Sequence, residues 1–393
     1  MRNRSVSVAA LGIAAAFALA ACSSSGGGNS GTSSQPAGGS SSSSSSSVAP
    51  PPSTGASSSG GGGTVDGKGA KVGIVLPDTT SSPRWVSADP DALKAACKKY
   101  NVQCQIQNGQ GSAQKQKTIA EQMEASGIKV LMLVDLDPAS GAAIEQEAEK
   151  NGVTVIDYDR LTPNGGAALY VSFDNVKVGE VQGKTLTQCS QVKNLKSVNY
   201  VEIDGAASDN NATLFNQGYE SVLSKQPGWK LVDEQDGNWD ATTAQREFTQ
   251  MLQKTPNIKA VMVANDTMAG GVITVLQRQN LNGKVAVSGQ DATAGGLQQI
   301  MLGNQCFTIY KPSAGEAYPA VQAAAMLANG QVPDTHGVTV TDPATKKKVP
   351  AILATPIAIT QKNVAQPIND GYTPKSTVCT GQFVSLCKKF GVK

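Results

Sequence analysis

Carboxylate, amide and basic side chains recur directly after short apolar runs of this chain. They are Asp78, Asp157, Asp159, Arg160, Asp204, Asp209, Asn265, Asp266, Gln290, Asp291 and Lys311. Carboxylates and amides can pair with neighbouring hydroxyl groups, and arginine and lysine donate charge-assisted hydrogen bonds. Trp85 and Trp239 lie in segments rich in Asx and glycine, which are typical of loops. An indole there can stack on an apolar C–H face of a ligand. This combination suits a polyhydroxylated ring such as a sugar.

The position of these polar residues indicates that they share one site. In open parallel sheets, ligands bind in the crevice beyond the carboxyl ends of the strands. Any one of these residues alone is more typical of a loop or a helix N-cap than of a binding site, since aspartate and asparagine favour N-caps. Their recurrence after successive strands predicts a polar crevice instead.

The segments between these residues alternate between two periodicities. Apolar or β-branched runs predict strands at 72–76, 130–134, 153–156, 198–203, 260–264, 285–288 and 307–310. Helical spacing predicts helices at 88–100, 114–126, 140–151, 176–188, 212–224, 242–254, 269–279, 294–302 and 316–329. This alternation predicts parallel sheets with helices on both faces, and its length predicts two such domains.

Catalytic signatures are near misses or absent. The run 179–185 approaches a phosphate-binding loop, but it is one residue short and falls inside a predicted helix. The segment 109–111 lacks the third glycine of a dinucleotide fingerprint, and no G-x-S-x-G motif occurs. The single histidine, His336, falls in a predicted exposed turn. We therefore expect a protein that is not an enzyme and holds no cofactor or metal. A glycosidase with paired carboxylates stays open, because carboxylate separation is a three-dimensional property.

The first residues have the pattern of an export signal. Arg2 and Arg4 precede an apolar stretch at 6–18, and the small residues Ala20 and Ala21 precede Cys22. This pattern predicts a signal peptide at 1–21. The cysteine after the small residues resembles the lipobox of bacterial lipoproteins, in which that cysteine is acylated. We expect an extracytoplasmic protein anchored by lipid on Cys22 to the outer face of the cell membrane. An ordinary signal peptide with a chance cysteine is the alternative.

The segment after the signal is a candidate tether. Residues 23–64 are almost all serine, glycine, proline and threonine, so they bury too little apolar surface to offset chain entropy. We expect residues 22–67 to form a lipidated, disordered linker spanning about 30–40 Å. Cleavage before Cys22 removes two of the 33 basic residues and leaves 31 against 30 acidic ones. This near-neutral balance gives no reason to expect nucleic acid as a partner.

Six cysteines remain besides Cys22, and an exported protein can keep disulfides. Proximity favours the pairs Cys97–Cys104 and Cys379–Cys387, which leaves Cys189–Cys306 as a long-range pair. Six cysteines allow fifteen connectivities, so this pairing is a preference. Metal binding is the competing use of cysteine, but no C-x-x-C spacing occurs.

From residue 70 to about 373 the chain resembles the periplasmic binding proteins of type I fold, most of all the branch that binds D-xylose and multiple sugars. The motifs are Pro83-Arg84-Trp85, Asp157-Tyr158-Asp159-Arg160, Ser172-Phe173-Asp174-Asn175, Asp209-Asn210-Asn211-Ala212, Ala264-Asn265-Asp266, Ser288-Gly289-Gln290-Asp291 and Tyr310-Lys311-Pro312. Many ordered matches over most of the mature chain carry the resemblance.

The resemblance implies an α/β fold with two doubly wound parallel-sheet domains joined by three crossover segments. The crossovers fall near 160–169, 308–311 and 351–357. The N-terminal lobe then comprises 68–159 and 311–350, and the C-terminal lobe comprises 160–310 and 351–393. By motif position, the residues that bind sugar are Arg84, Trp85, Asp159, Arg160, Asp209, Asn211, Trp239, Asn265, Asp291 and Lys311. Trp85 and Trp239 would flank the ring.

The resemblance also implies partners. We expect a monomer that closes its cleft on a monosaccharide, xylose or a similar pentose or hexose. It would then deliver the sugar to the membrane permease of an ABC importer with its ATPase. A sensory module that presents the sugar to a membrane kinase and a hydrolase on a similar scaffold are the alternatives. The export signal argues against a third, a sugar-responsive repressor.

The lipid anchor can be tested on the purified protein. We expect the mature chain to begin at Cys22 and to carry lipid there, because the cysteine follows the small-residue cleavage site. Mass spectrometry of the N-terminal peptide measures the added mass. A peptide with an unmodified Cys22 would remove the anchoring claim.

Overall fold

The computed structural model describes residues 65–393, so the predicted signal peptide, Cys22 and almost all of the tether lie outside the described residues. The described chain packs from its first residues, ahead of the predicted start at residue 68. Val65 packs on the apolar core, and the backbone of Gly67 donates to the carbonyl of Tyr100 at 2.7 Å. Within residues 65–393, no helix combines the length and the apolar character needed to cross a bilayer.

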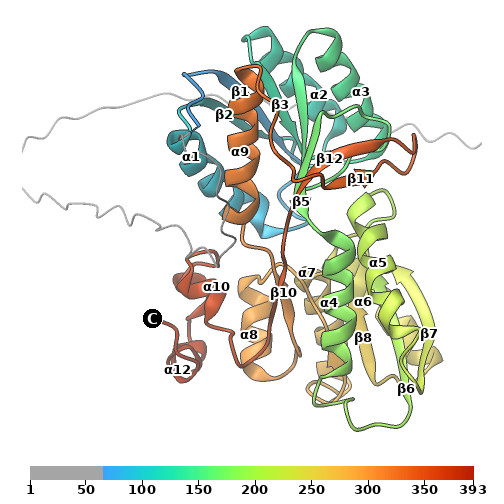
Figure 1. The fold of residues 1–393 in the computed structure, drawn as a ribbon. Helices are drawn as coiled ribbons and strands as arrows, with labels where there is room; N and C mark the ends of the chain where they lie inside the picture. The colour runs from blue at the N-terminus through green and yellow to red at the C-terminus, as the bar shows by residue number, and fades with distance from the viewer. Residues whose placement is uncertain (1–64) are drawn as a thin grey trace, which may run out of the picture. The chain divides into compact units, whose positions relative to one another are not determined.

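The first lobe is built on a seven-stranded sheet in the order β11-β12-β5-β4-β3-β1-β2, parallel except for the β11–β12 pair. Its strands are β1 (Lys71–Leu76), β2 (Gln103–Asn108), β3 (Val130–Leu133), β4 (Thr154–Tyr158), β5 (Leu169–Phe173), β11 (Thr339–Thr341) and β12 (Lys348–Ala354). Its helices are η1 (Pro83–Val86), α1 (Ala88–Lys99), α2 (Ala113–Ala125), α3 (Pro138–Lys150) and α9 (Ala314–Ala328). α1 and α9 lie side by side (Figure 1). Tyr100 and Tyr318 are in edge contact.

The second lobe contains a parallel four-stranded sheet in the order β7-β6-β8-β9. Its strands are β6 (Val198–Asp204), β7 (Trp229–Asp236), β8 (Ala260–Val263) and β9 (Ala286–Val287). Its helices are α4 (Asn175–Thr187), α5 (Asn210–Leu223), α6 (Ala241–Lys254), α7 (Asp266–Arg278) and α8 (Ala294–Leu302). Separate apolar clusters lie on the two faces of each large sheet, so the predicted α/β class with helices on both faces is confirmed.

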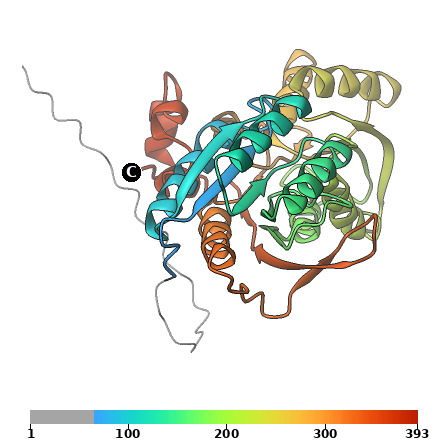
Figure 2. The same cartoon turned by 90° about the horizontal axis from the view of Figure 1, so that it is seen from above.

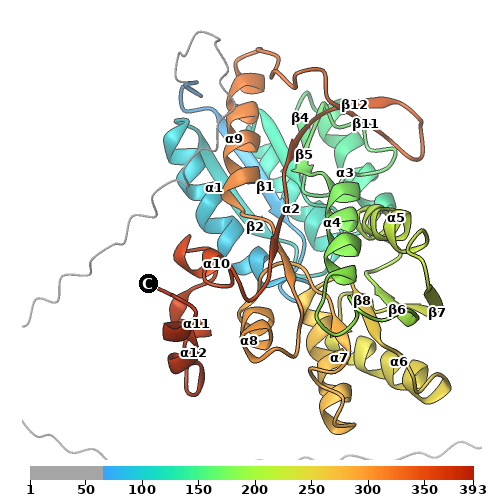
Figure 3. The same cartoon turned by 60° about the horizontal axis from the view of Figure 1, so that its bottom comes forward.

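The remaining elements follow the two large sheets. β10 (Thr308–Tyr310) and β13 (Ile357–Ile359) form an antiparallel pair. The short helices α10 (Gln366–Asn369), α11 (Lys375–Val378) and α12 (Phe383–Lys389) end the chain. Figure 3 shows them grouped beside α8, where the side-chain amide of Gln298 donates to the carbonyl of Val378 at 2.9 Å.

The strand pairing moves two of the predicted lobe boundaries. β5 pairs with β4 and β12, so residues 169–173 belong to the first sheet, whereas the prediction assigned 160–310 to the second lobe. The first crossover therefore falls at Asp174, later than the predicted 160–169. β12 extends the first sheet to Ala354, past the predicted boundary at residue 350. Figure 2 shows the red-orange segment that contains β11 and β12 from above. The other two crossovers, at 311–313 and 355–356, lie within or next to the predicted segments.

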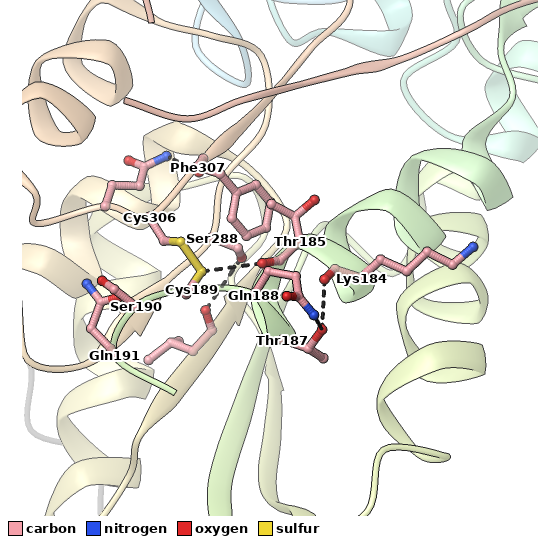
Figure 4. Close-up of a disulfide and its surroundings, with 12 residues drawn as sticks. Lys184, Thr185, Thr187, Gln188, Cys189, Ser190, Gln191, Ser288, Cys306 and Phe307 are labelled. Carbon is pink, nitrogen blue, oxygen red and sulfur yellow. Dashed lines mark hydrogen bonds between the residues drawn. A yellow bond between two sulfur atoms is a disulfide. The ribbon is translucent and has the colours of Figure 1, made fainter. Parts of the chain in front are cut away.

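The three disulfides of the structure pair the cysteines as proximity favoured. Cys97–Cys104 joins α1 to β2, and Cys379–Cys387 joins the end of α11 to α12. Cys189–Cys306 joins the segment after α4 to the start of β10 and closes a stretch of 117 residues. This disulfide lies beside Phe307, in an apolar cluster of the second lobe (Figure 4). It therefore links elements at opposite ends of the lobe's sequence.

Loop length predicts unequal contributions of these disulfides to stability. A cross-link restricts the unfolded chain more when the loop is longer, about 4–5 kcal/mol for Cys189–Cys306 and about 2 kcal/mol for a loop like that of Cys97–Cys104. We expect the double variant Cys189→Ala/Cys306→Ala to lose about twice as much free energy of unfolding as Cys97→Ala/Cys104→Ala. Denaturant unfolding followed by circular dichroism measures both. Equal losses would contradict the loop-length argument.

Candidate functional site

All ten predicted site residues line one pocket between the two lobes. The pocket lining also includes four residues outside that set, Ser81, Ser82, Phe215 and Gln290. The cavity measures about 30 Å³, which is room for one or two water molecules and not for a sugar ring. The walls are therefore nearly in contact, and a larger ligand requires them to move apart.

Both lobes contribute side chains from the carboxyl ends of parallel strands. From the first lobe come Arg84 and Trp85 on η1, with Asp159 and Arg160 directly after β4. From the second come residues after four successive strands: Asp209 and Asn211 after β6, Trp239 after β7, Asn265 after β8 and Asp291 after β9. Lys311 lies in the crossover after β10. The crevice geometry predicted from strand order is thus present.

Helix capping fixes two of these side chains. Asp209 accepts from the backbone N–H of Asn211 at 2.9 Å, and Asn265 accepts from that of Met268 at 2.9 Å. Both are N-caps, of α5 and α7 respectively. Capping and pocket lining are therefore not alternatives here, because the cap holds a side chain at the pocket edge while leaving its second polar atom free for other contacts.

Four other residues of the polar pattern do not line the pocket. Asp78 accepts from the backbone of Thr80 and Ser81 and shapes its own loop. Asp157 and Asp266 are buried and bond to neighbouring loops through Thr162 and Gln305. Asp204 ends β6 and bonds to Tyr219 of α5. The pattern therefore identifies the correct edge of the sheets, but it does not distinguish residues that line the pocket from residues that stabilise nearby loops.

Arg84 is the buried centre of the first-lobe wall. Its guanidinium donates to both carboxylate oxygens of Asp89 at 2.7 Å, to Asp159 at 2.6 Å and to Glu316 at 2.5 Å. These three acids come from α1, the end of β4 and α9. Four of the five guanidinium N–H groups are used within the protein. Arg84 thus supports the wall and keeps one N–H for a ligand.

The charges around Arg84 are unequal. Burial raises the pKa of Glu316 to about 8; Arg84 opposes the shift, and the charges of Asp159 and Asp89 add to it. Burial also acts to raise the pKa of Asp159, but Arg84, Lys311 and Arg160 outweigh it and hold that pKa below its ordinary value. At neutral pH, Asp159 is therefore ionised while Glu316 mostly keeps its proton.

Three polar contacts join the lobes across the pocket. Arg160 pairs with Asp209 at 3.1 Å. The side-chain amide of Asn211 donates to the carboxylate of Asp159 at 3.1 Å and to its carbonyl at 3.0 Å. The amide of Asn265 donates to the carbonyl of Ser81 at 3.1 Å. These contacts hold the narrow arrangement closed, and all three must break for the walls to separate.

Strained backbone occurs at three pocket residues. Asp159, Trp239 and Asp291 have φ angles of 66°, 58° and 91°, a region that side chains other than glycine seldom adopt and that costs about 1–3 kcal/mol. Around Asp159 the carbonyl accepts from Tyr170 at 3.1 Å and from Ser172 at 2.7 Å. Such strain persists where surrounding contacts enforce it.

Aromatic rings form part of both walls. Trp85 is 3% exposed and lies under the guanidinium of Arg84, 4.4 Å from its ring centroid. On the other side, Trp239 meets Phe215 edge to face at 6.4 Å between centroids. A Cβ on Gly205 would lie 2.1 Å from the indole of Trp239, so this ring position requires glycine there. Phe215 escaped prediction because an apolar residue inside helix α5 reads as core.

Four buried polar atoms of the lining have no hydrogen-bond partner in the described chain: Ser82 Oγ, Trp239 Nε1, Gln290 Oε1 and Asp291 Oδ1. Lys311 Nζ lies 3.5 Å from Asp291 Oδ1, as an ion pair rather than a hydrogen bond. Two of the four atoms can donate and three can accept. Buried polar atoms are nearly always paired in native proteins, so a cluster of exceptions in one pocket points to a polar ligand.

Comparisons with known proteins place this geometry in a family. The family described as "Periplasmic binding protein domain" matches residues 72–331. The D-xylose-binding periplasmic protein of Escherichia coli is 34% identical over 316 residues, covering 79% of this chain and 92% of that protein. The multiple sugar-binding periplasmic receptor ChvE of Rhizobium radiobacter is 29% identical, covering 76% and 89%. A carbohydrate transporter solute binding protein from Chloroflexus aurantiacus, solved with D-glucose, has 30% identity and a TM-score of 0.69, covering 78% and 97%.

The shifted pKa of Glu316 predicts how stability varies with pH. Its pKa of about 8 in the folded protein lies above the ordinary value of 4.5. The resulting stabilisation is therefore complete below about pH 4.5 and is lost as the pH rises through about 8. In the variant Glu316→Gln this side chain cannot ionise. Between about pH 5 and pH 9, we expect the free energy of unfolding of this variant to fall by at least about 1 kcal/mol less than that of the unaltered protein.

Denaturant unfolding at several pH values measures this difference. Glu121→Gln is the matched control, because Glu121 is half exposed on α2 and pairs only with Lys117. The free energy of unfolding of this control should vary with pH as that of the unaltered protein does. Parallel profiles for Glu316→Gln and the unaltered protein would mean that Glu316 is already ionised at neutral pH.

Proposed function

The chain belongs to the periplasmic binding protein domain family, and from that premise we propose that it binds a monosaccharide between its two lobes outside the cytoplasmic membrane. Its relatives are solute-binding proteins rather than enzymes. In this proposal the ten predicted side chains bind the sugar, and no bond of the sugar is broken.

The unpartnered polar atoms of the pocket carry the proposal. Ser82, Trp239, Gln290 and Asp291 present donors and acceptors within one small lining. Sugar hydroxyls both donate and accept, so a single ring can pair with all four groups. Trp85 and Trp239 supply flat apolar faces for the C–H groups of the ring. A ligand lacking one hydroxyl would strand a buried partner at a cost of about 1–3 kcal/mol, which gives the site its selectivity.

The size of the cavity supports binding by lobe closure. A sugar cannot enter a space of about 30 Å³, so it must meet an open form in which the interlobe contacts of Arg160, Asn211 and Asn265 are broken. The crossovers at 174, 311–313 and 355–356 are the segments that can act as hinges. Closing them on the sugar would replace the water around each hydroxyl by protein groups.

The choice of sugar and the transport role rest on the relatives. D-xylose, multiple sugars and D-glucose appear in the names of the matched proteins, so a pentose or hexose of the xylose type is the proposed ligand. We propose delivery of this sugar to the permease and ATPase of an ABC importer by the closed monomer. Cys22 would hold the protein to the membrane by lipid, as the lipobox pattern indicates.

A sensory role is the second candidate. One matched relative is described as a receptor, and the same closed form could be presented to a membrane kinase. Sugar uptake by cells that lack this protein separates the two roles. Lost uptake supports transport, and normal uptake with a lost transcriptional response supports sensing.

A sugar screen followed by one substitution tests the binding site. We expect thermal-shift assays with pentoses and hexoses to identify at least one sugar that stabilises the protein. For that sugar, Asp291→Asn should raise the dissociation constant at least about thirtyfold, equivalent to about 2 kcal/mol, because the change removes the negative charge and turns one of the two acceptor oxygens into a donor. Isothermal titration calorimetry measures the change.

Asp334→Asn serves as the control, since Asp334 is 74% exposed beside His336 and remote from the pocket lining. It should leave sugar affinity unchanged. Unaltered affinity in a folded Asp291→Asn protein, or no stabilising sugar in the screen, would reject the proposed site.

A further inference from the structure

An acidic cluster lies on one face of the second-lobe sheet, outside the sugar pocket. Glu202 and Asp204 are two residues apart on β6, so they lie on the same face of the sheet. Glu234 of β7 pairs with Glu202 in the strand register. One carboxylate oxygen from each of these three residues lies within 4.8 Å of the others. None of the three lines the pocket between the lobes.

The side-chain amide of Asn216, from α5, lies at the centre of this cluster. Its nitrogen is 3.5 Å from an oxygen of Glu202, 3.4 Å from Asp204 and 3.3 Å from Glu234. An amide nitrogen carries two hydrogens and cannot serve three acceptors well, and all three distances are long for such bonds. The oxygen of the same amide can take the place of the nitrogen by rotation about the last side-chain bond.

Glu202 supplies an independent sign of a missing partner. Its side chain is completely buried, and Oε1 has no hydrogen-bond partner within residues 65–393. The strand register places Glu202 on the same sheet face as Glu234, and its other oxygen, Oε2, lies 3.5 Å from the amide nitrogen of Asn216. The carboxyl of Glu220, on α5, is a further acid in contact with the side chain of Glu202. A buried carboxylate oxygen without a partner is costly, and a cation is the partner that restores the balance.

No basic side chain neutralises the cluster. Within residues 65–393, neither Glu202 nor Asp204 nor Glu234 forms an ion pair with lysine or arginine. Several acids thus share a site with no opposing charge, and a cation would supply that charge.

We propose that Glu202, Asp204 and Glu234, with the amide oxygen of Asn216, bind a hard divalent cation of the Ca²⁺ type. An all-oxygen set with no histidine or cysteine selects such a cation over zinc. Glu234 is exposed, so the cation can enter from solvent and water molecules can complete its coordination. The ion would join β6, the edge strand β7 and α5. This proposal does not depend on the proposed binding of sugar.

Terbium luminescence tests this site directly. Tyr219 donates to Asp204, so its ring lies close enough to sensitise a Tb³⁺ ion held by that carboxylate. We expect the chelator-treated protein to give saturable Tb³⁺ emission on tyrosine excitation, and CaCl₂ at millimolar concentration to compete it away. Calorimetric titration with CaCl₂ should show one site, and Glu234→Gln should weaken it at least about tenfold.

Asp233→Asn is the matched control. Asp233 neighbours Glu234 on β7 but pairs with Lys254 at 2.9 Å, so its substitution should change the Ca²⁺ affinity less than about twofold. Three results would overturn the proposal. They are the absence of saturable Tb³⁺ emission, emission that Ca²⁺ does not displace, and equal Ca²⁺ binding by Glu234→Gln and the unaltered protein. Because Glu234 is exposed, its variant is expected to fold, and circular dichroism checks this.

Discussion

The buried guanidinium of Arg84 is the interaction on which the first-lobe wall depends. It joins acids from α1, the end of β4 and α9, which the chain supplies from positions as far apart as 89 and 316. It also pairs with the carboxylate of Asp159, a residue in the left-handed conformation whose carboxylate and carbonyl accept from Asn211 of the second lobe. A buried charge costs several kcal/mol unless it is paired, so the first-lobe wall depends on these three acids remaining in contact with Arg84.

The second-lobe wall is held in place by helix caps rather than by a buried charge network. Its side chains project from the ends of parallel strands, where the helix N-caps Asp209 and Asn265 hold their positions. Trp239 reaches the pocket because Gly205 leaves room for its ring. One wall is therefore a charge network and the other a row of capped loops. A sugar between them would meet fixed donors and acceptors on both sides, which reduces the entropy lost on binding.

Much of this arrangement could be predicted because parallel strands end at a common edge, and every predicted helix corresponds to an observed one. The misses have physical causes. The short buried strand β5 is absent from the predicted strands, and the first crossover was therefore placed too early. Glu316 begins a predicted helix, and nothing in its local sequence indicates that the fold buries it against Arg84. The cluster around Glu202 depends on the pairing of β6 with β7, which no local pattern specifies.

A crystal structure with the most tightly bound sugar tests the central claim most directly. The account predicts one sugar ring between Trp85 and Trp239, with its hydroxyls within hydrogen-bond distance of the groups that lack partners in the closed chain. These are the side chains of Ser82, Gln290 and Asp291 and the indole N–H of Trp239. A sugar bound elsewhere, or one that leaves these atoms unpaired, would contradict it.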